Sequence, residues 1–167
     1  LRKPKVAEYL GIEGGIGVTD VLIGRARLAD VLLPWGNRSL FVLPAGRIPP
    51  NPSELLGSER MQKLLDALTK EFDVVLCDAP PLLPVTDAAV LSRSTAGAIM
   101  VVAVGKTTTQ QLDGALEALE TVGSKVAGVV LTMVPTKGAD AYAYGYGYGY
   151  GGYGIYETAS STSGASA

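Results

Sequence analysis

The stretch Ala98–Leu131, AIMVVAVGKTTTQQLDGALEALETVGSKVAGVVL, holds two apolar runs on either side of a helical pattern. The first run, Ala98–Val104, predicts a buried strand, and the second, Val126–Leu131, predicts another. Thr107–Thr109 can cap a helix between them, and Gly123 can end it. Apolar residues share one face of this helix: Leu112, Ala115, Leu116, Leu119 and Val122. The order strand, helix, strand is typical of a βαβ unit with parallel strands.

The residues before this stretch continue the alternation of strand-like and helix-like segments. Phe72–Leu76 is apolar apart from Asp73, and a run that is apolar on both faces predicts a strand inside a parallel sheet covered by helices. Thr86 can cap a short helix that follows, and Leu40–Leu43 predicts an earlier strand. The pattern therefore predicts an α/β fold.

Two helices are predicted between the strands at Leu40–Leu43 and Phe72–Leu76. Asn51-Pro52-Ser53-Glu54 combines a capping residue, a proline at the first helical position and an early glutamate, which is a helix-opening arrangement. From Ser58, apolar residues recur at helical spacing, at Met61, Leu64, Leu65 and Leu68.

The chain divides by composition into a globular body, residues 1–136, and a tail, residues 137–167. Glycine-rich sequence without aliphatic periodicity cannot offset the entropy of ordering, so we expect a disordered tail. Seven of the eight tyrosines lie in this tail: Tyr142, Tyr144, Tyr146, Tyr148, Tyr150, Tyr153 and Tyr156. Accessible tyrosines in a flexible segment suit phosphoryl transfer, each modification adding about −1.5 to −2 charges. An unmodified low-complexity tail is the alternative.

Composition excludes several classes of function. The 167 residues include 47% hydrophobic and 18% charged residues, no histidine, one cysteine (Cys77) and a formal net charge of −2. A Ser-His-Asp triad, histidine metal ligation, zinc clusters and an internal disulfide are therefore excluded, and no basic surface indicates nucleic acid as a partner. The longest apolar run is far shorter than the roughly 20 residues of a membrane span, and no signal peptide is recognisable.

Asp78 follows the apolar run Phe72–Leu76 directly after Cys77, where ligands gather in open α/β sheets. A carboxylate there can hold Mg²⁺ against nucleotide phosphates, or it can cap the turn before Pro80 and Pro81; both interpretations stay open. Asp87 stands in the first turn of the predicted helix after Thr86, where a negative charge favours the helix dipole.

Two glycine-containing segments resemble phosphate loops superficially. The G-x-x-x-x-G-K-[ST] motif needs a glycine five positions before Gly105, where Met100 stands inside a predicted strand. Lys106 is therefore interpreted as a strand-end residue. No strand precedes Gly11–Gly17, which is interpreted as a connecting loop. The printed residues contain no phosphate-binding loop.

Taken together, these segments resemble the cytoplasmic domain of the bacterial tyrosine autokinases (BY-kinases) of capsular and exopolysaccharide synthesis. The resemblance covers nearly the whole chain and depends on the order of several motifs. They are LRKP (1–4), GVTDVL (17–22), PAGRIPPNPSELLGSERM (44–61), FDVVLCDAPPLLPVTDA (72–88), GVVLTMVP (128–135) and the tyrosine-rich end.

The resemblance implies roles for particular positions. Asp78 corresponds to the Walker B aspartate that organises Mg²⁺, and the tail tyrosines correspond to autophosphorylation sites. Leu1–Pro4 corresponds to the end of the Walker A′ segment, whose aspartates, one of them the base, would precede Leu1; the Walker A loop and an oligomerisation motif would lie further upstream. Thr132 and Met133 stand where the family usually has asparagine and arginine, the asparagine helping to recognise adenine.

The fold implied is a three-layer parallel sheet of the P-loop NTPase (deviant Walker A) type, lacking its N-terminal strands. The function implied is ATP- and Mg-dependent protein-tyrosine autokinase activity that regulates polysaccharide polymerisation and export, at the cytoplasmic face of the bacterial plasma membrane. Implied partners are further copies in a ring, a transmembrane polysaccharide co-polymerase segment, fused or separate, and a cognate tyrosine phosphatase.

Because the printed residues hold the acceptor and one metal-organising acid but no phosphate cradle, we expect this chain to be inactive and of low stability alone. Two alternatives remain: a partition- or assembly-type ATPase switch, and a non-catalytic regulatory module whose tyrosines are phosphorylated by a partner kinase.

Overall fold

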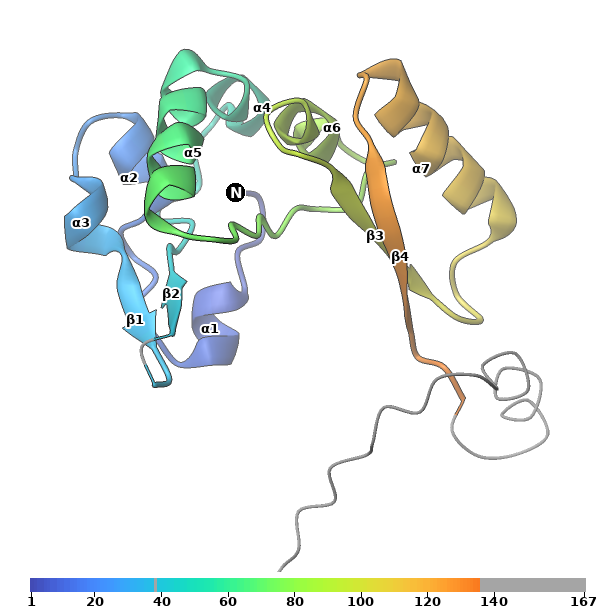
Figure 1. The fold of residues 1–167 in the computed structure, drawn as a ribbon, viewed down its shortest axis with the longest axis horizontal. Helices are drawn as coiled ribbons and strands as arrows, with labels where there is room; N and C mark the ends of the chain where they lie inside the picture. The colour runs from blue at the N-terminus through green and yellow to red at the C-terminus, as the bar shows by residue number, and fades with distance from the viewer. Residues whose placement is uncertain (38, 136–167) are drawn as a thin grey trace, which may run out of the picture.

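The computed structural model describes residues 1–37 and 39–135. Its parallel unit consists of β3 (Ala98–Ala103) and β4 (Val126–Thr132), joined by α7 (Thr109–Thr121), and confirms the predicted βαβ order (Figure 1). α7 begins with a capping box: the Thr108 hydroxyl accepts the Gln111 N–H at 3.2 Å, and the Gln111 side chain accepts the Thr108 N–H at 3.0 Å. Gly123, at φ 72°, follows the end of the helix in the left-handed conformation that glycine tolerates.

α7 covers one face of the parallel pair. Its Ala115 and Leu119 are buried with Met100 of β3 in one small core. Because side chains alternate along a strand, Ile99 and Val101 point to the other face, where they are 56% and 66% exposed. The parallel unit therefore has one packed face and one open apolar face.

A second core surrounds α5 (Glu59–Glu71), whose Met61, Leu64, Leu65 and Leu68 are all buried. Ser58 caps this helix by accepting the N–H of Met61 at 3.2 Å, as its sequence predicts. The same core takes one leucine from each of three short helices: α2 (Val18–Leu22), α4 (Pro52–Leu56) and α6 (Asp87–Ser92).

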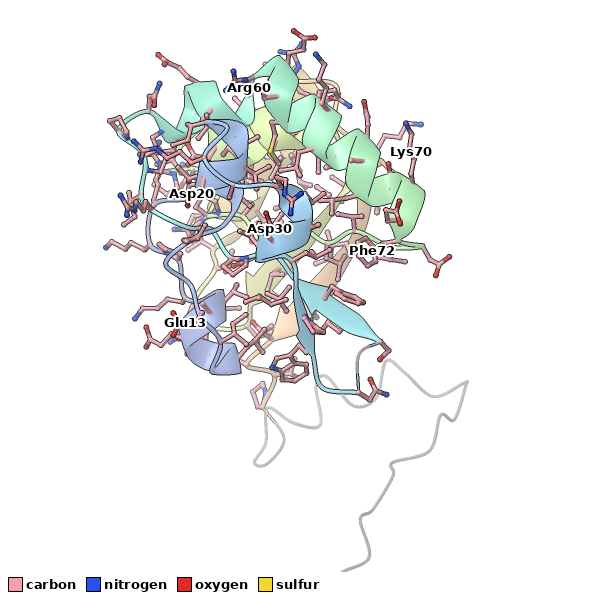
Figure 2. The ribbon with its side chains drawn as sticks, turned by 90° about the vertical axis from the view of Figure 1, so that its left-hand side faces the viewer. Glu13, Asp20, Asp30, Arg60, Lys70 and Phe72 are labelled. Atoms are coloured by element: carbon pink, nitrogen blue, oxygen red, sulfur yellow. The ribbon has the colours of Figure 1, made fainter. Side chains whose placement is uncertain are left out.

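Polar and aromatic contacts fasten α5 to its neighbours. Figure 2 shows Arg60, Lys70 and Phe72 along this helix and just beyond its end. Arg60 donates to the Leu22 carbonyl oxygen at 2.8 Å, at the end of α2. Phe72 stacks in a tilted arrangement on Phe41, with ring centroids 5.4 Å apart.

Phe41 belongs to a two-stranded antiparallel sheet formed by β1 (Leu33–Trp35) and β2 (Leu40–Val42). β2 confirms the strand predicted at Leu40–Leu43, whereas β1 was not predicted. Three short helices, α1 (Val6–Leu10), α2 and α3 (Leu28–Val31), were not predicted either.

The predicted strand at Phe72–Leu76 is wrong for this structure. The segment follows α5 as irregular backbone, and Val74 and Leu76 are 72% and 80% exposed. A strand requires a neighbouring strand to pair with, and within the described residues the two sheets are β1–β2 and β3–β4. The observed architecture is α/β with one pair of parallel strands instead of the expected three-layer sheet.

None of the helices within the described ranges combines the length and apolar character needed to cross a membrane. The prediction of a disordered tail at 137–167, and all seven of its tyrosines, lie outside the described residues.

Candidate functional site

Asp78 lies in the irregular segment that connects α5 to α6, and its side chain is exposed. The turn that follows begins only at Leu82, and the structure gives the Asp78 carboxylate no hydrogen-bond partner among the described residues. The cap interpretation therefore lacks its hydrogen bond, and Asp78 is an accessible acid beside Cys77 and Ala79.

The fit of Mg²⁺ to this acid depends on how many ligands lie near it. No group of three or more His, Cys, Asp or Glu residues that could hold a metal ion occurs within residues 1–37 and 39–135. Mg²⁺ is commonly bound by one or two carboxylates together with substrate phosphates and waters. Asp78 fits as one oxygen ligand of such a site.

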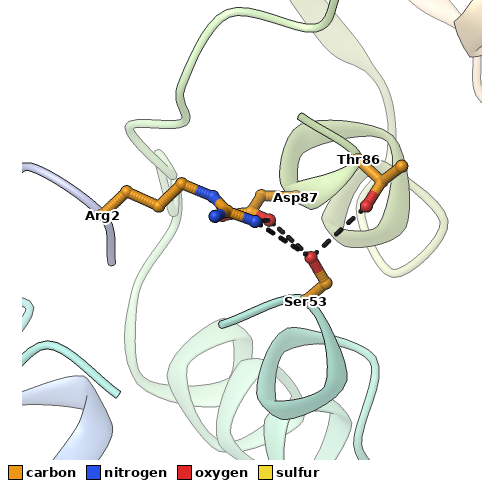
Figure 3. A network of polar contacts seen from close by, with 4 residues as sticks. All are labelled: Arg2, Ser53, Thr86 and Asp87. Atoms are coloured by element: carbon orange, nitrogen blue, oxygen red, sulfur yellow. Dashed lines mark hydrogen bonds and ion pairs between the residues drawn. The ribbon is translucent and has the colours of Figure 1, made fainter. Parts of the chain in front are cut away.

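A partly buried polar network lies at the start of α6, where the segment that carries Asp78 ends (Figure 3). Asp87 is 0% exposed, and its two carboxylate oxygens accept Arg2 Nε and Nη2, each at 2.8 Å. Ser53 Oγ, on α4, donates to Asp87 Oδ1 at 2.6 Å and lies 3.3 Å from Thr86 Oγ1. The network thus joins the N-terminal segment to the beginnings of α4 and α6.

The hydrogen bonds from Arg2 hold the pKa of Asp87 below its usual value, although burial acts in the opposite direction. The same hydrogen bonds raise the pKa of Arg2. Both groups are therefore charged at neutral pH, and the fork of the guanidinium matches the carboxylate in the bidentate geometry that is strongest for such pairs.

Sequence reasoning interpreted Asp87 as a helix-dipole residue and did not pair it with Arg2 or Ser53. Asp87 does open α6, but its carboxylate is directed to Arg2, a residue 85 positions away in the chain. Sequence patterns that span a few residues do not reveal a contact between residues 85 positions apart. Arg2 belongs to LRKP (1–4), one of the motifs that carry the family resemblance, and this membership was its only sequence signal.

The turn at Gly105-Lys106-Thr107 agrees with the interpretation of Lys106 as a strand-end residue. The N–H groups of Lys106 and Thr107 both donate to the Ala103 carbonyl oxygen, at 3.1 and 2.9 Å, and Thr107 Oγ1 accepts the Ala103 N–H at 3.2 Å. Since these amides are already engaged, they cannot converge on a phosphate. The other glycine-rich segment, Gly11–Gly17, connects α1 to α2, in agreement with its interpretation as a loop.

Thr132 and Met133, at the end of β4, lie in different surroundings. The Thr132 hydroxyl lies 3.4 Å from the Val102 carbonyl oxygen on β3, to which it donates. Met133 is 58% exposed and has a φ of 58°, a left-handed conformation that is uncommon outside glycine. Such conformations cluster at binding sites. The assignment of Thr132 and Met133 to adenine recognition stays a prediction.

Several curated bacterial proteins are similar to this chain, although no protein-family model matches it. It is 35% identical over 134 residues to the tyrosine-protein kinase Wzc of Salmonella typhi, which covers 80% of this chain and 19% of that protein. It is 37% identical over 131 residues to the tyrosine-protein kinase YwqD of Bacillus subtilis, covering 78% of this chain and 55% of that one. The chain therefore spans about half, or less, of the length of these relatives.

Solved structures agree in sequence and fold. The kinase domain of VpsO matches with a TM-score of 0.74 and 34% identity, over 78% of this chain and 64% of that one. The kinase domain of the Escherichia coli tyrosine kinase ETK matches with a TM-score of 0.73 and 30% identity, over 83% of this chain and 56% of that one.

Proposed function

This chain is homologous to a segment of the bacterial tyrosine-protein kinases, and we propose that it forms the C-terminal part of the kinase domain of an ATP-dependent protein-tyrosine autokinase. The observation that carries the proposal is the agreement of sequence and fold with kinase domains, each over about four-fifths of the chain. We propose residues 1–136 as part of a P-loop kinase domain and residues 137–167 as its acceptor tail.

The open apolar surfaces support a larger sheet than the described residues form. Val74 and Leu76 before Asp78, and Ile99 and Val101 on the open face of β3, are more than half exposed. Such residues are typical of strands buried on both faces of a parallel sheet. In this proposal, strands outside the printed residues complete a three-layer sheet and bring Phe72–Leu76 into it.

The proposed roles follow from the chemistry of each group. Phosphoryl transfer depends on positioning and on neutralising phosphate charge, which Mg²⁺ supplies when bound. Asp78, as the exposed acid, would provide one oxygen to that ion. Thr132 and Met133 would lie at the adenine ring, and the tail tyrosines would accept the phosphoryl group.

The resemblance supports a wider setting for this activity. We propose that the kinase controls capsular or exopolysaccharide polymerisation and export at the cytoplasmic face of the bacterial plasma membrane. It would act as a homo-oligomeric ring, with a transmembrane co-polymerase segment and a cognate tyrosine phosphatase as partners.

The first experiment incubates the 167-residue chain with Mg·ATP and detects phosphotyrosine. We expect no labelling of the chain alone, because its residues contain no G-x-x-x-x-G-K-[ST] loop. We expect labelling when it is mixed with an active relative, and none in a control chain with all seven tail tyrosines replaced by phenylalanine. Robust labelling of the chain alone would contradict its proposed dependence on further residues.

The second experiment uses the complete product of the gene that encodes these residues. Asp78→Asn should lower autophosphorylation by roughly 100-fold or more, the size of effect seen when one electrostatic stabiliser of a transition state is lost. Asp113→Asn, at an exposed acid on α7, is the matched control and should leave the rate unchanged.

The outcomes separate the candidate functions. ATP hydrolysis without phosphotyrosine would favour an ATPase switch. Labelling that needs a partner kinase even in the complete product would favour a phosphoacceptor module, the second candidate.

A further inference from the structure

Residues 2–16, which we call the strap, contribute no buried side chain to the fold. They contain α1, which has five residues, no side-chain cap and no buried residue. Helices this short are not stable by themselves in water, because too few hydrogen bonds offset the cost of nucleation. Figure 1 shows the N-terminus in the middle of the molecule and α1 at its lower edge. The position of the strap therefore depends on what holds its two ends and its middle.

The far end of the strap is held by close backbone contacts. The N–H groups of Val18 and Thr19 donate to the carbonyl oxygens of Pro44 and Ala45, at 2.8 and 3.0 Å. Gly17 lies so close to the same backbone that a Cβ atom there would be 2.0 Å from the Pro44 carbonyl oxygen. This end therefore cannot move without disturbing the segment that follows β2.

The near end of the strap is held by side chains instead. Both oxygens of the Asp87 carboxylate accept hydrogen bonds from Arg2, and Ser53 Oγ donates to one of them. Leu1, next to Arg2, packs against the core around α5. The Asp87 carboxylate is fully buried whereas the Arg2 side chain is 41% exposed, so Arg2 is the member of the pair that faces solvent. These contacts can break without the loss of any backbone hydrogen bond in α4 or α6.

Among the described residues, one hydrogen bond joins the middle of the strap to another element. The indole N–H of Trp35, on β1, donates to the Leu10 carbonyl oxygen at 3.1 Å. Gly11 ends α1 at a φ of 65°, and Gly14 and Gly15 follow it. Glycine adopts such conformations without strain, so the chain can bend between α1 and the fixed far end. The middle therefore offers little resistance to movement once the near end is released.

We infer that the strap opens and closes as one unit while the rest of the chain stays folded, and that the contacts of Arg2 with Asp87 and Ser53 are its latch. Segments with few buried apolar contacts open locally at a lower free energy than the whole molecule. Opening uncovers the Asp87 carboxylate and the indole N–H of Trp35. Water can then solvate the carboxylate, so no charge is left buried without a partner. The strap is a property of the described residues and does not depend on kinase activity.

The strap is tested by native-state hydrogen exchange of the 167-residue chain, followed residue by residue by NMR at urea concentrations below the unfolding transition. Two reporters are the amides of Tyr9 and Ile12, which donate to the carbonyl oxygens of Lys5 and Ala7 at 2.9 and 3.0 Å. The indole N–H of Trp35 is a third reporter, on another element. All three should exchange at least about 10-fold faster than the slowest amides of α5, with little dependence on urea, because a local opening exposes little surface.

The latch is tested by Arg2→Met, because methionine keeps an apolar stem but has neither the charge nor the donors of arginine. Exchange at the three reporters should become about 10- to 100-fold faster, the effect expected from losing hydrogen bonds to a charged group. Asp87→Asn should accelerate the same reporters. The double variant should exchange no faster than the faster single variant, since both substitutions open one latch.

The matched control is Arg27→Met, which removes another bidentate pair, with both distances 2.8 Å, between exposed residues three positions apart. It should leave the three reporters at their wild-type rates. Reporters that share the urea dependence of α5 would overturn the strap, because they would then exchange only when the whole chain unfolds. Wild-type exchange in Arg2→Met, or additive effects in the double variant, would overturn the role of Arg2 as its latch.

Discussion

Replacing Leu76 with serine should barely change the stability of this chain, although Leu76 lies in an apolar run whose sequence predicts a buried strand. Full burial of a leucine side chain contributes about 1.5–3 kcal/mol. Leu76 is 80% exposed, so only about a fifth of that is at stake, and Leu76→Ser should lower the free energy of unfolding by roughly 0.3–0.6 kcal/mol. Leu64→Ala is the matched control at a side chain that is 6% exposed, and should cost about 2–5 kcal/mol.

The assay is urea unfolding followed by circular dichroism, at several protein concentrations, with sedimentation velocity on the same samples. Leu76→Ser should also reduce self-association, because exposed apolar segments and unpaired strand edges promote it. A cost for Leu76→Ser equal to that of Leu64→Ala would refute the exposed position of Leu76. If that cost grew with protein concentration, the side chain would be buried between copies instead.

The stability cost of Leu76→Ser should differ between this chain and the complete gene product. If further strands cover Phe72–Leu76 there, as proposed, Leu76→Ser should cost about 1.5–3 kcal/mol in that context. A cost below 1 kcal/mol in the complete product, on the same scale, would contradict the proposed completion of the sheet.

Three other predictions concern single side chains. Arg2 lowers the pKa of Asp87 in the folded state. The stability contributed by this ionised carboxyl is therefore present above the ordinary aspartate pKa of about 4 and is lost as the pH falls through the lowered folded value. Urea melts between pH 6 and pH 2 should show a loss of stability that Asp87→Asn lacks, and an identical loss in that variant would assign it to other groups. Thr108→Ala should cost about 0.5–2 kcal/mol by removing the cap of α7, whereas Thr109→Ala should be nearly neutral in the same melts. Lys106→Met should leave kcat and KM for ATP of the complete gene product within about two-fold, because Lys106 is interpreted as a strand-end residue. The lysine of a phosphate loop, in contrast, reaches the phosphates directly. A large loss of kcat would therefore assign Lys106 to the nucleotide site.

The elements that were predicted correctly are those whose signals lie within a few residues of one another. α7 has its capping box, its apolar face and its terminal glycine inside one window, and α5 has Ser58 and four regularly spaced apolar residues. The hydrogen bonds that cap these helices join residues three positions apart, so a short window of the sequence contains both partners.

Other elements were missed because no clear sequence pattern marks them. β1 contains Pro34, which argues against a strand, and it exists because β2 pairs with it. The candidate site divides in the same way. The accessible acid Asp78 could be named from its place after an apolar run, whereas the pairing of Asp87 with Arg2 and Ser53 could not.

Sequence alone therefore determined the βαβ order and the apolar faces of α5 and α7. It did so because helix periodicity and capping are local properties of the chain. Only the tertiary structure decided that Phe72–Leu76 is not a strand here and that Asp87 is a buried partner of Arg2. A strand is defined by its neighbour and a buried charge by its counter-ion, and both can lie anywhere along the chain.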